Sequence, residues 1–226
     1  MSVNKFCSVV SMFSKCKRDL ACQTGFSGMM GIQILYMLNL KLSAYLMARV
    51  DADKSKIALD EKRKLKITDR DFSNFFGLPE GRNQFLASTA ELSPACIHFV
   101  KEAEAINEKG PHSLKAVENI LARPISEEST AMDIASFKMA YIVFCVGTVL
   151  NPGSKHDHSF IDYWSALRDP TEINIYNWAA YRKDNLIRGA TRFQADTKAN
   201  LTAINITGCH LYLQVQQLLF SCTPHI

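Results

Sequence analysis

The stretch DIASFKMAYIVFCVGTVL, Asp133 to Leu150, decides the fold class because it is apolar on nearly every side of a helix, with Lys138 as its main interruption. A helix that is hydrophobic all round lies in the interior of a protein or in a membrane. The strictly apolar run, Met139 to Leu150, is well short of the roughly 20 residues that span a bilayer. We therefore predict a central buried helix of a helical domain, no transmembrane segment and no membrane partner.

Further helices are predicted on both sides of this segment, from apolar residues at helical spacing and from capping residues. Thr68 with Asp71 three residues later resembles a capping box, and Ser93 followed by Pro94 is a typical helix start. The predicted helices are 34–50, 69 to about 77, 94 to about 110, 114 to just before Pro124, 160–167, 174 to about 200, and a last one capped by Thr207.

The segment KIALDEKRKLKIT places apolar residues alternately around a charged turn, at Ile57, Leu59, Leu65 and Ile67. This alternation predicts a two-stranded hairpin, which must lean on helices because a lone hairpin is marginally stable. The predicted fold is therefore mainly α, a single multi-helix domain with one small two-stranded β-hairpin. We divide the chain into an N-terminal arm or helix (1–24), the helical domain (25–220) and a tail (221–226).

Charge limits the function classes that the composition allows. The 226 residues carry a formal charge of +4, from 26 basic and 22 acidic side chains, which is too small for a dedicated nucleic-acid binder. Any nucleic-acid or nuclear-import contact must come from local clusters. The alternative for each cluster, a solvated hairpin turn or outer helix face, is the commoner one. The candidate contacts are Lys62, Arg63, Lys64 and Lys66 within EKRKLK, and Arg182, Arg188 and Arg192, beside Lys183, on the long helix.

Cysteine usage and the N-terminus point to an intracellular protein. The seven cysteines form an odd set without a Cys-x-x-Cys motif, which favours a reducing compartment and excludes a zinc ribbon. The first residues have no small-residue cleavage pattern, so we expect no secretion. Location in the nucleus or the cytoplasm follows.

Two stretches invite a chemical interpretation. In NPGSKHDHSFIDYW, 151–164, His156 and His158, with Asp157 between them, could ligate a metal or transfer protons, or they could belong to a polar loop that caps the next helix. Cys209 and His210 are adjacent on a helix and cannot activate each other, although His98 or His112 could supply a partner. The glycines of GFSGMMG lack the spacing of a phosphate-binding loop. No catalytic, cofactor-binding or metal-ligating residue is assigned.

A family resemblance adds to these observations. Several blocks, in this order, resemble the region upstream of a SUMO-type cysteine protease in grass transposon-encoded proteins, and more distantly the aminotransferase-like plant mobile domain. They are GFSGMM (25–30), LNLKLSAYLMARVD (38–51), FFGLPEG (75–81), KGPHSLKAVENIL (109–121), SFKMAYIVFCVGTVLNPGSKHDH (136–158), IDYWSALRDP (161–170), Asn177-Trp178 and TGCHLYLQV (207–215). The signature residues are Lys155, His156, Asp157, Trp164, Trp178, Gly208, Cys209 and His210.

The resemblance implies a protein derived from a plant mobile element, with the nucleus as the favoured location. It gives no catalytic role, because the His, Asp, Gln and Cys of the family's downstream protease module have no counterpart before Ile226. The first hypothesis is a non-enzymatic interaction or scaffold domain without the protease module, whose protein partner and oligomeric state the sequence does not identify. The alternatives are a nucleic-acid-binding module using residues 61–66 and the basic face of the long helix, and a truncated transposon fragment without function. No cofactor is expected.

Overall fold

In the computed structural model, the apolar segment forms the central helix α7 (Ala131–Cys145), which continues as a π-helical turn, η3 (Val146–Leu150). Thr130 and Asp133 form a capping box at its start. From Ala135 to Leu150 every residue except Lys138 is buried. Within the described part of the chain, 131–150 is the one helical segment long and apolar enough to cross a membrane, but 83% of its apolar window is buried inside the protein.

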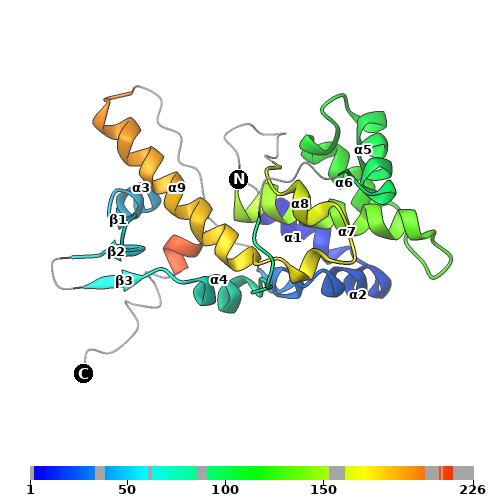
Figure 1. The fold of residues 1–226 in the computed structure, drawn as a ribbon, viewed down its shortest axis with the longest axis horizontal. Coiled ribbons are helices and arrows are strands. Elements are labelled where there is room, and N and C mark those ends of the chain that lie inside the picture. Colours follow the sequence, from blue (N-terminus) through cyan, green and yellow to red (C-terminus); the bar gives the residue numbers. More distant parts are fainter. Residues whose placement is uncertain are drawn as a thin grey trace.

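The structure describes residues 3–33, 39–60, 63–85, 91–152, 161–201, 209 and 211–215. The remaining elements, shown in Figure 1, are α1 (Val3–Ser11), α2 (Lys15–Gln23), η1 (Ser27–Gly31), α3 (Leu40–Met47), β1 (Val50–Asp51), β2 (Lys56–Ala58), β3 (Lys64–Lys66), α4 (Asp69–Phe76), α5 (Pro94–Ile106), η2 (Gly110–His112), α6 (Leu114–Ala122), α8 (Trp164–Leu167), η4 (Ile173–Ile175) and α9 (Trp178–Lys198). Residues 211–215 are also helical. The prediction of a mainly α protein is confirmed.

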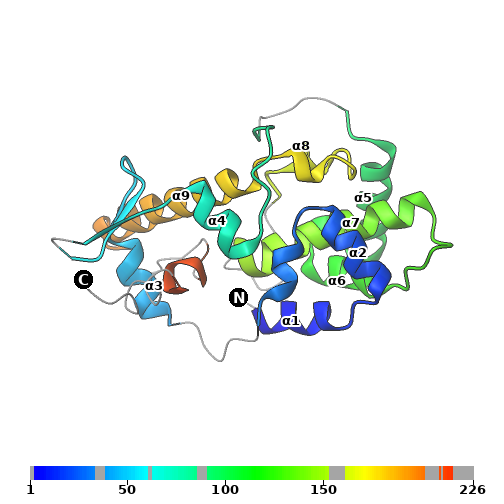
Figure 2. The ribbon, with the colours of Figure 1, turned by 90° about the horizontal axis from the view of Figure 1, so that it is seen from below.

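Helices α1, α2, α5 and α6 gather around α7 at one end of the molecule (Figures 1 and 2). Aromatic rings hold the N-terminal helices to it, because Phe6 of α1 stacks on Phe144 with ring centroids 6.0 Å apart and Phe13 meets Phe137 edge-on at 5.4 Å. The N-terminal residues therefore belong to the same core, while the division into 1–24, 25–220 and 221–226 remains a prediction.

The sheet and α3 lie at the opposite end of the long axis, and α9 runs from the centre of the molecule toward them (Figure 1). The Gln194 side-chain amide on α9 donates to the carbonyls of Met47 and Val50, at 2.9 and 2.8 Å. The strands are antiparallel in the order β1-β2-β3, and the register pairs Ile57 with both Val50 and Leu65. These apolar side chains share the face of the sheet that packs on the core.

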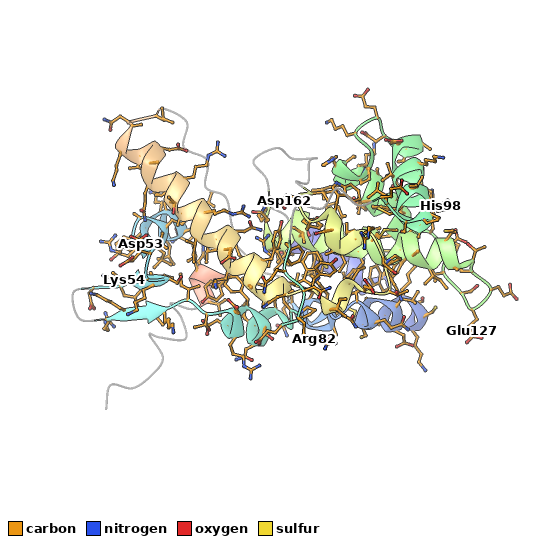
Figure 3. The ribbon with its side chains drawn as sticks, in the orientation of Figure 1. Asp53, Lys54, Arg82, His98, Glu127 and Asp162 are labelled. Carbon is orange, nitrogen blue, oxygen red and sulfur yellow. The ribbon has the colours of Figure 1, made fainter. Side chains whose placement is uncertain are left out.

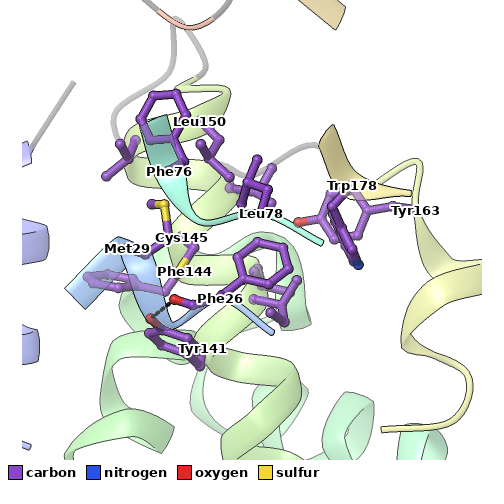
Figure 4. Packing of buried hydrophobic residues seen from close by; sticks show 14 of the residues in the cluster. Phe26, Met29, Phe76, Leu78, Tyr141, Phe144, Cys145, Leu150, Tyr163 and Trp178 are labelled. Atoms are coloured by element: carbon purple, nitrogen blue, oxygen red, sulfur yellow. Dashed lines mark hydrogen bonds between the residues drawn. The ribbon is translucent and has the colours of Figure 1, made fainter. Parts of the chain in front are cut away.

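Near the centre, two chain segments touch at a pair of glycines. Gly77 ends α4 in the left-handed conformation, with φ +62°, and a Cβ built on it would lie 2.7 Å from the Cα of Gly28. Around this contact Phe26, Met29, Phe76 and Leu78 pack together, and Tyr141 donates a hydrogen bond to the Phe26 carbonyl at 3.0 Å (Figure 4). The glycines of GFSGMMG therefore include one that close backbone packing requires.

Two predicted elements differ in the structure. The sheet has a third strand, β1, and the helix predicted over 34–50 is shorter: it begins at Leu40, where Asn39 accepts from the Leu42 N–H at 3.1 Å, and ends at Met47. Val50 belongs to β1, since an apolar residue at helical spacing can equally point inward from a strand. Residues 34–38 lie outside the described residues.

Several helices begin or end at other residues than the sequence predicts. Helix α5 ends at Ile106, because the backbone of Asn107 is extended, and Gly110, with φ +53°, opens the separate turn η2. Helix α8 begins at Trp164, and α9 begins at Trp178, where the Asn177 side chain caps it. The predicted starts at Thr68, Ser93 and Ser113 are confirmed as side-chain caps. The cap predicted at Thr207 lies outside the described residues.

Candidate functional site

Three lysines share the outer face of the small sheet. In the antiparallel register Lys56 lies opposite Lys66, and Ala58 lies opposite Lys64. Residues directly opposite, and residues two apart on one strand, point to the same side, so these lysines stand on the side away from Ile57. Lys64 and Lys66 are exposed and Lys56 is half-buried. We name this surface, formed by Lys56, Lys64 and Lys66, the lysine face.

Two acidic residues beside the lysine face, Asp51 and Asp60, form ion pairs with other cations. The Asp51 carboxylate pairs with Lys54 at 3.7 Å, and the Asp60 carboxylate accepts from Arg63. Among the described residues no carboxylate lies within ion-pairing distance of Lys56, Lys64 or Lys66. Asp51 lies opposite Lys56 in the register of β1 and β2, but its carboxylate pairs with Lys54. The three ammonium groups of the lysine face therefore form no ion pair with a described carboxylate. The sheet that carries them lies near one end of the long axis, where Figure 3 labels Asp53 and Lys54.

The structure divides the basic cluster predicted on the hairpin. Lys64 and Lys66 belong to the lysine face, and the structure adds Lys56, which lies outside the EKRKLK motif. Arg63 is exposed but paired with Asp60. Lys62 lies outside the described residues. The period-2 alternation of the hairpin could have identified Lys56, because it places this residue on the same side as Lys64 and Lys66 once the register is known.

Arg182 is not a surface contact, and its prediction as one is wrong. Its side chain is fully buried: Nη2 donates to the Leu150 carbonyl at 2.5 Å, and Nε and Nη1 have no hydrogen-bond partner. Burial lowers the pKa of the guanidinium, and the aromatic ring of Tyr181 lies 5.4 Å from it. Helical spacing explains the position, because Arg182 falls between Trp178 and Leu186 on the inward side of α9.

Arg188 and Arg192 are exposed on α9, as expected, but each has an acidic neighbour. Arg188 lies 3.7 Å from Asp162, and Arg192 lies 4.0 Å from Asp196. Arg192 is also two residues, about 200° around the helix, from Gln194, which faces the sheet. Lys183, on the same helix, is bound to Asp69 at 2.7 Å. The structure therefore does not bring the α9 cations and the lysine face together into one surface.

A pocket of about 340 Å³ lies beside Arg188. Within it the ring of Phe85 packs on Tyr181, with centroids 4.4 Å apart, and the Tyr181 hydroxyl donates to Asp162. Burial raises the pKa of Tyr181, so its hydroxyl stays protonated near neutral pH. The lining residues are Gln84, Phe85, Asp162, Tyr181, Asp184 and Arg188. Its charges are mixed and mutually paired, which gives no clear preference for an anionic or a cationic ligand.

The family signature residues that the structure describes are packing residues. Trp178 is fully buried and donates from Nε1 to the Ile173 carbonyl at 2.8 Å, and Trp164 packs against the core. Lys155, His156, Asp157, Gly208 and His210 lie outside the described residues.

Cys209, the last signature residue, is buried near the Val149 carbonyl at the end of η3, and burial raises the pKa of its thiol to about 11. A nucleophilic cysteine needs the opposite shift. The first proposed partner, His98 on α5, lies beside Asp133 at the start of α7. Cys209 lies beside Val149, which is 16 residues further along, or about 24 Å of helix. His98 is therefore too far from Cys209 to activate its thiol. His112 lies in η2, which packs on α5 and α6.

Three side chains that could hold a metal ion, His98, Glu102 and Asp133, come together where α5 meets the start of α7. Sequence patterns alone predict no metal-ligating role for these three residues. His98 and Glu102 have the one-turn spacing of a helical chelate, but the third residue comes from a different helix, and only the tertiary structure brings it near.

Comparison with known proteins gives one match. A family model described as a domain of unknown function (DUF8566) matches residues 1–214. No curated protein and no solved structure matches the chain. The resemblance to transposon-encoded proteins and to the plant mobile domain therefore stays a prediction.

Proposed function

The chain belongs to the family of the domain of unknown function DUF8566, and we propose that it acts by binding nucleic acid through the lysine face. This proposal takes up the alternative of a nucleic-acid-binding module in preference to the first hypothesis of an interaction or scaffold domain. It keeps the hairpin half of the predicted basic surface and leaves out the α9 half.

The observation that carries the proposal is that no described carboxylate lies within ion-pairing distance of Lys56, Lys64 or Lys66, while Asp51 and Asp60 pair with Lys54 and Arg63. Like charges directly opposite on neighbouring strands destabilise a sheet. A phosphate backbone would remove this repulsion, because phosphate groups lie close enough together for neighbouring lysines to contact several of them at once.

The composition of this face supports backbone contacts rather than base recognition. The described positions on it are Asp51, Lys56, Ala58, Lys64 and Lys66. Arginine, asparagine and glutamine, which form paired hydrogen bonds with base edges, are missing from these positions, as are aromatic rings for stacking. We therefore expect affinity that depends strongly on salt and weakly on sequence.

The chemistry of Cys209 favours binding over catalysis. Its thiol is buried and its pKa is raised, so little thiolate is available near neutral pH. A location in the nucleus and an origin from a plant mobile element are compatible with nucleic-acid binding, and both rest on the sequence resemblance.

Fluorescence anisotropy with a labelled duplex of about 20 base pairs at low salt tests the proposal. Replacing Lys56, Lys64 and Lys66 together by alanine should weaken binding by about tenfold or more. The control replaces Lys15, Lys101 and Lys109, which are exposed on the other half of the molecule and remove the same charge. Equal losses in the two variants, or no binding by the unaltered protein, would contradict the proposal.

A further inference from the structure

We propose that His98, Glu102 and Asp133 form a binding site for a divalent transition-metal ion such as Zn²⁺. The site lies at the end of the molecule opposite the lysine face: Figure 3 labels His98 on α5 and Glu127 in the loop before α7 there, far from Lys54. It does not depend on the proposed nucleic-acid binding.

The three residues offer ligand atoms of the right kind at close range. His98 and Glu102 are one helical turn apart on α5, and Asp133 occupies the first turn of α7. One ligand atom from each residue, an imidazole nitrogen or a carboxylate oxygen, lies within 4.8 Å of the other two. One nitrogen and two carboxylate oxygens suit Zn²⁺ and similar ions better than Mg²⁺ or Ca²⁺, which prefer oxygen ligands alone.

A pocket of about 270 Å³ adjoins these groups and contains polar atoms without partners. Ser136, only 2% exposed, lines the pocket, and its hydroxyl has no hydrogen-bond partner. Oε2 of Glu102 is likewise buried and unpartnered, and Nε2 of His98 makes no hydrogen bond, although Oε1 of Glu102 is 3.5 Å away. Buried polar atoms normally have partners. A metal ion with a bound water would supply partners for Glu102 and His98, and a water in the pocket would supply one for Ser136, which lines it.

Neighbouring residues fix one oxygen of each carboxylate and leave the other for a metal. Oδ2 of Asp133 accepts from the Thr130 N–H at 3.1 Å and from the Thr130 hydroxyl at 2.6 Å. Arg123 donates to Oε1 of Glu102. Hydrogen bonds of this kind orient metal-binding carboxylates in proteins.

Ion pairing alone accounts for only part of the arrangement. Arg123 and His98 both face Oε1 of Glu102, and these contacts link α5 to the end of α6. They leave Oε2 of Glu102 and the Ser136 hydroxyl unexplained, and they place the Asp133 carboxylate close to a second negative charge. A divalent cation would neutralise both carboxylates and hold α5 against the start of α7.

Titration of the full chain with Co²⁺ tests the site, because Co²⁺ replaces Zn²⁺ and its visible spectrum reports its ligands. We expect one tightly bound ion with d–d absorption and no sulfur-to-metal charge-transfer band, which separates this site from the cysteines. Calorimetry with Zn²⁺ should then show binding weakened by more than about tenfold in His98→Ala, Glu102→Gln and Asp133→Asn, and by about tenfold in Thr130→Val. Circular dichroism checks that each variant is folded.

The control is Glu127→Gln, which removes an exposed carboxylate near the same end of the molecule and should leave affinity unchanged. Absence of a nitrogen- and oxygen-ligated Co²⁺ spectrum in the unaltered protein would overturn the proposal without reference to any variant. Equal Zn²⁺ affinity in the unaltered protein and in the folded Asp133→Asn variant would overturn it as well.

Discussion

Lys56 lies directly opposite Lys66 across strands β2 and β3, with both side chains on the outer face of the sheet and without an acidic partner among the described residues. The hairpin could have been neutral on this face, because its carboxylates at Asp51 and Asp60 are near in sequence. They pair instead with Lys54 and Arg63. The positive charge of the lysine face therefore depends on the pairing register of β2 and β3 as well as on the number of lysines in the hairpin.

Reversing one of these charges should raise stability and lower affinity. In Lys66→Glu the like-charged pair becomes an oppositely charged one, which should increase the free energy of unfolding by about 0.5 kcal/mol. Binding to duplex DNA should weaken, as measured by anisotropy. Lys101→Glu on α5 is the control and should change neither quantity appreciably. A Lys66→Glu variant that is less stable than the unaltered protein would contradict the register.

Arg182 should be dispensable for both folding and binding if a hydrophobic side chain of similar size replaces it. Its buried guanidinium makes one hydrogen bond and leaves Nε and Nη1 unpaired, so desolvation outweighs what the charge gains. Urea unfolding of Arg182→Met should give a stability equal to or above that of the unaltered protein. Arg182→Ala should lose about 2–5 kcal/mol, because it leaves a cavity. A loss of DNA affinity in a stable Arg182→Met variant would contradict this account and show that Arg182 contributes to DNA binding.

Gly77 should tolerate no side chain. Its φ of +62° disfavours other residues, and an added Cβ would lie 2.7 Å from the backbone of Gly28. We expect Gly77→Ala to lower the free energy of unfolding by about 2 kcal/mol or more. Gly31→Ala is the matched control, since no atom lies within 4 Å of its added Cβ, and it should stay within about 0.5 kcal/mol. Equal stability of the two variants would show that η1 and the end of α4 are not in contact.

Stability should fall as the pH rises above 9. Burial raises the pKa of Cys209 from 9.0 to about 11 and raises the pKa of Cys145 as well. Between pH 9 and 11 the unfolded chain therefore binds fewer protons than the folded one, and the free energy of unfolding decreases. The stability that these protonated thiols contribute is fully present below pH 9 and is lost as the pH rises through the folded-state pKa. For Cys209 it amounts to about 3 kcal/mol. Urea unfolding should show a shallower decline for Cys209→Ala, and an unchanged decline would exclude a buried thiol there.

Local signals in the sequence identified most of the helices. Thr68 with Asp71, Ser93 with Pro94, and Ser113 act through atoms only a few residues away, so their capping roles could be predicted without tertiary information. The apolar segment ending at Leu150 was equally informative, because a helix without a polar face lies in a protein core or a membrane, and its apolar run is too short to span a bilayer. Strand β1 was missed because two residues carry no periodic pattern, and Val50 also fits the period of the preceding helix.

The candidate sites depend on contacts between distant parts of the chain. Its charge alone suggests that Arg182 is exposed, whereas its helical spacing from Trp178 and Leu186 places it on the inward side of α9. The side chain is buried, as the spacing indicates. Lys56 joined the lysine face only through strand pairing. Asp133 reached His98 only through the packing of α5 on α7, which local sequence patterns do not reveal.

The salt dependence of DNA binding tests the central claim most directly. Each lysine that contacts a phosphate contributes about one unit to the slope of log affinity against log salt. Replacing Lys56, Lys64 and Lys66 by alanine should therefore make this slope less steep by about three, whereas replacing Lys15, Lys101 and Lys109 should leave it unchanged. The same slope in the unaltered protein and the Lys56, Lys64 and Lys66 variant would contradict nucleic-acid binding by the lysine face.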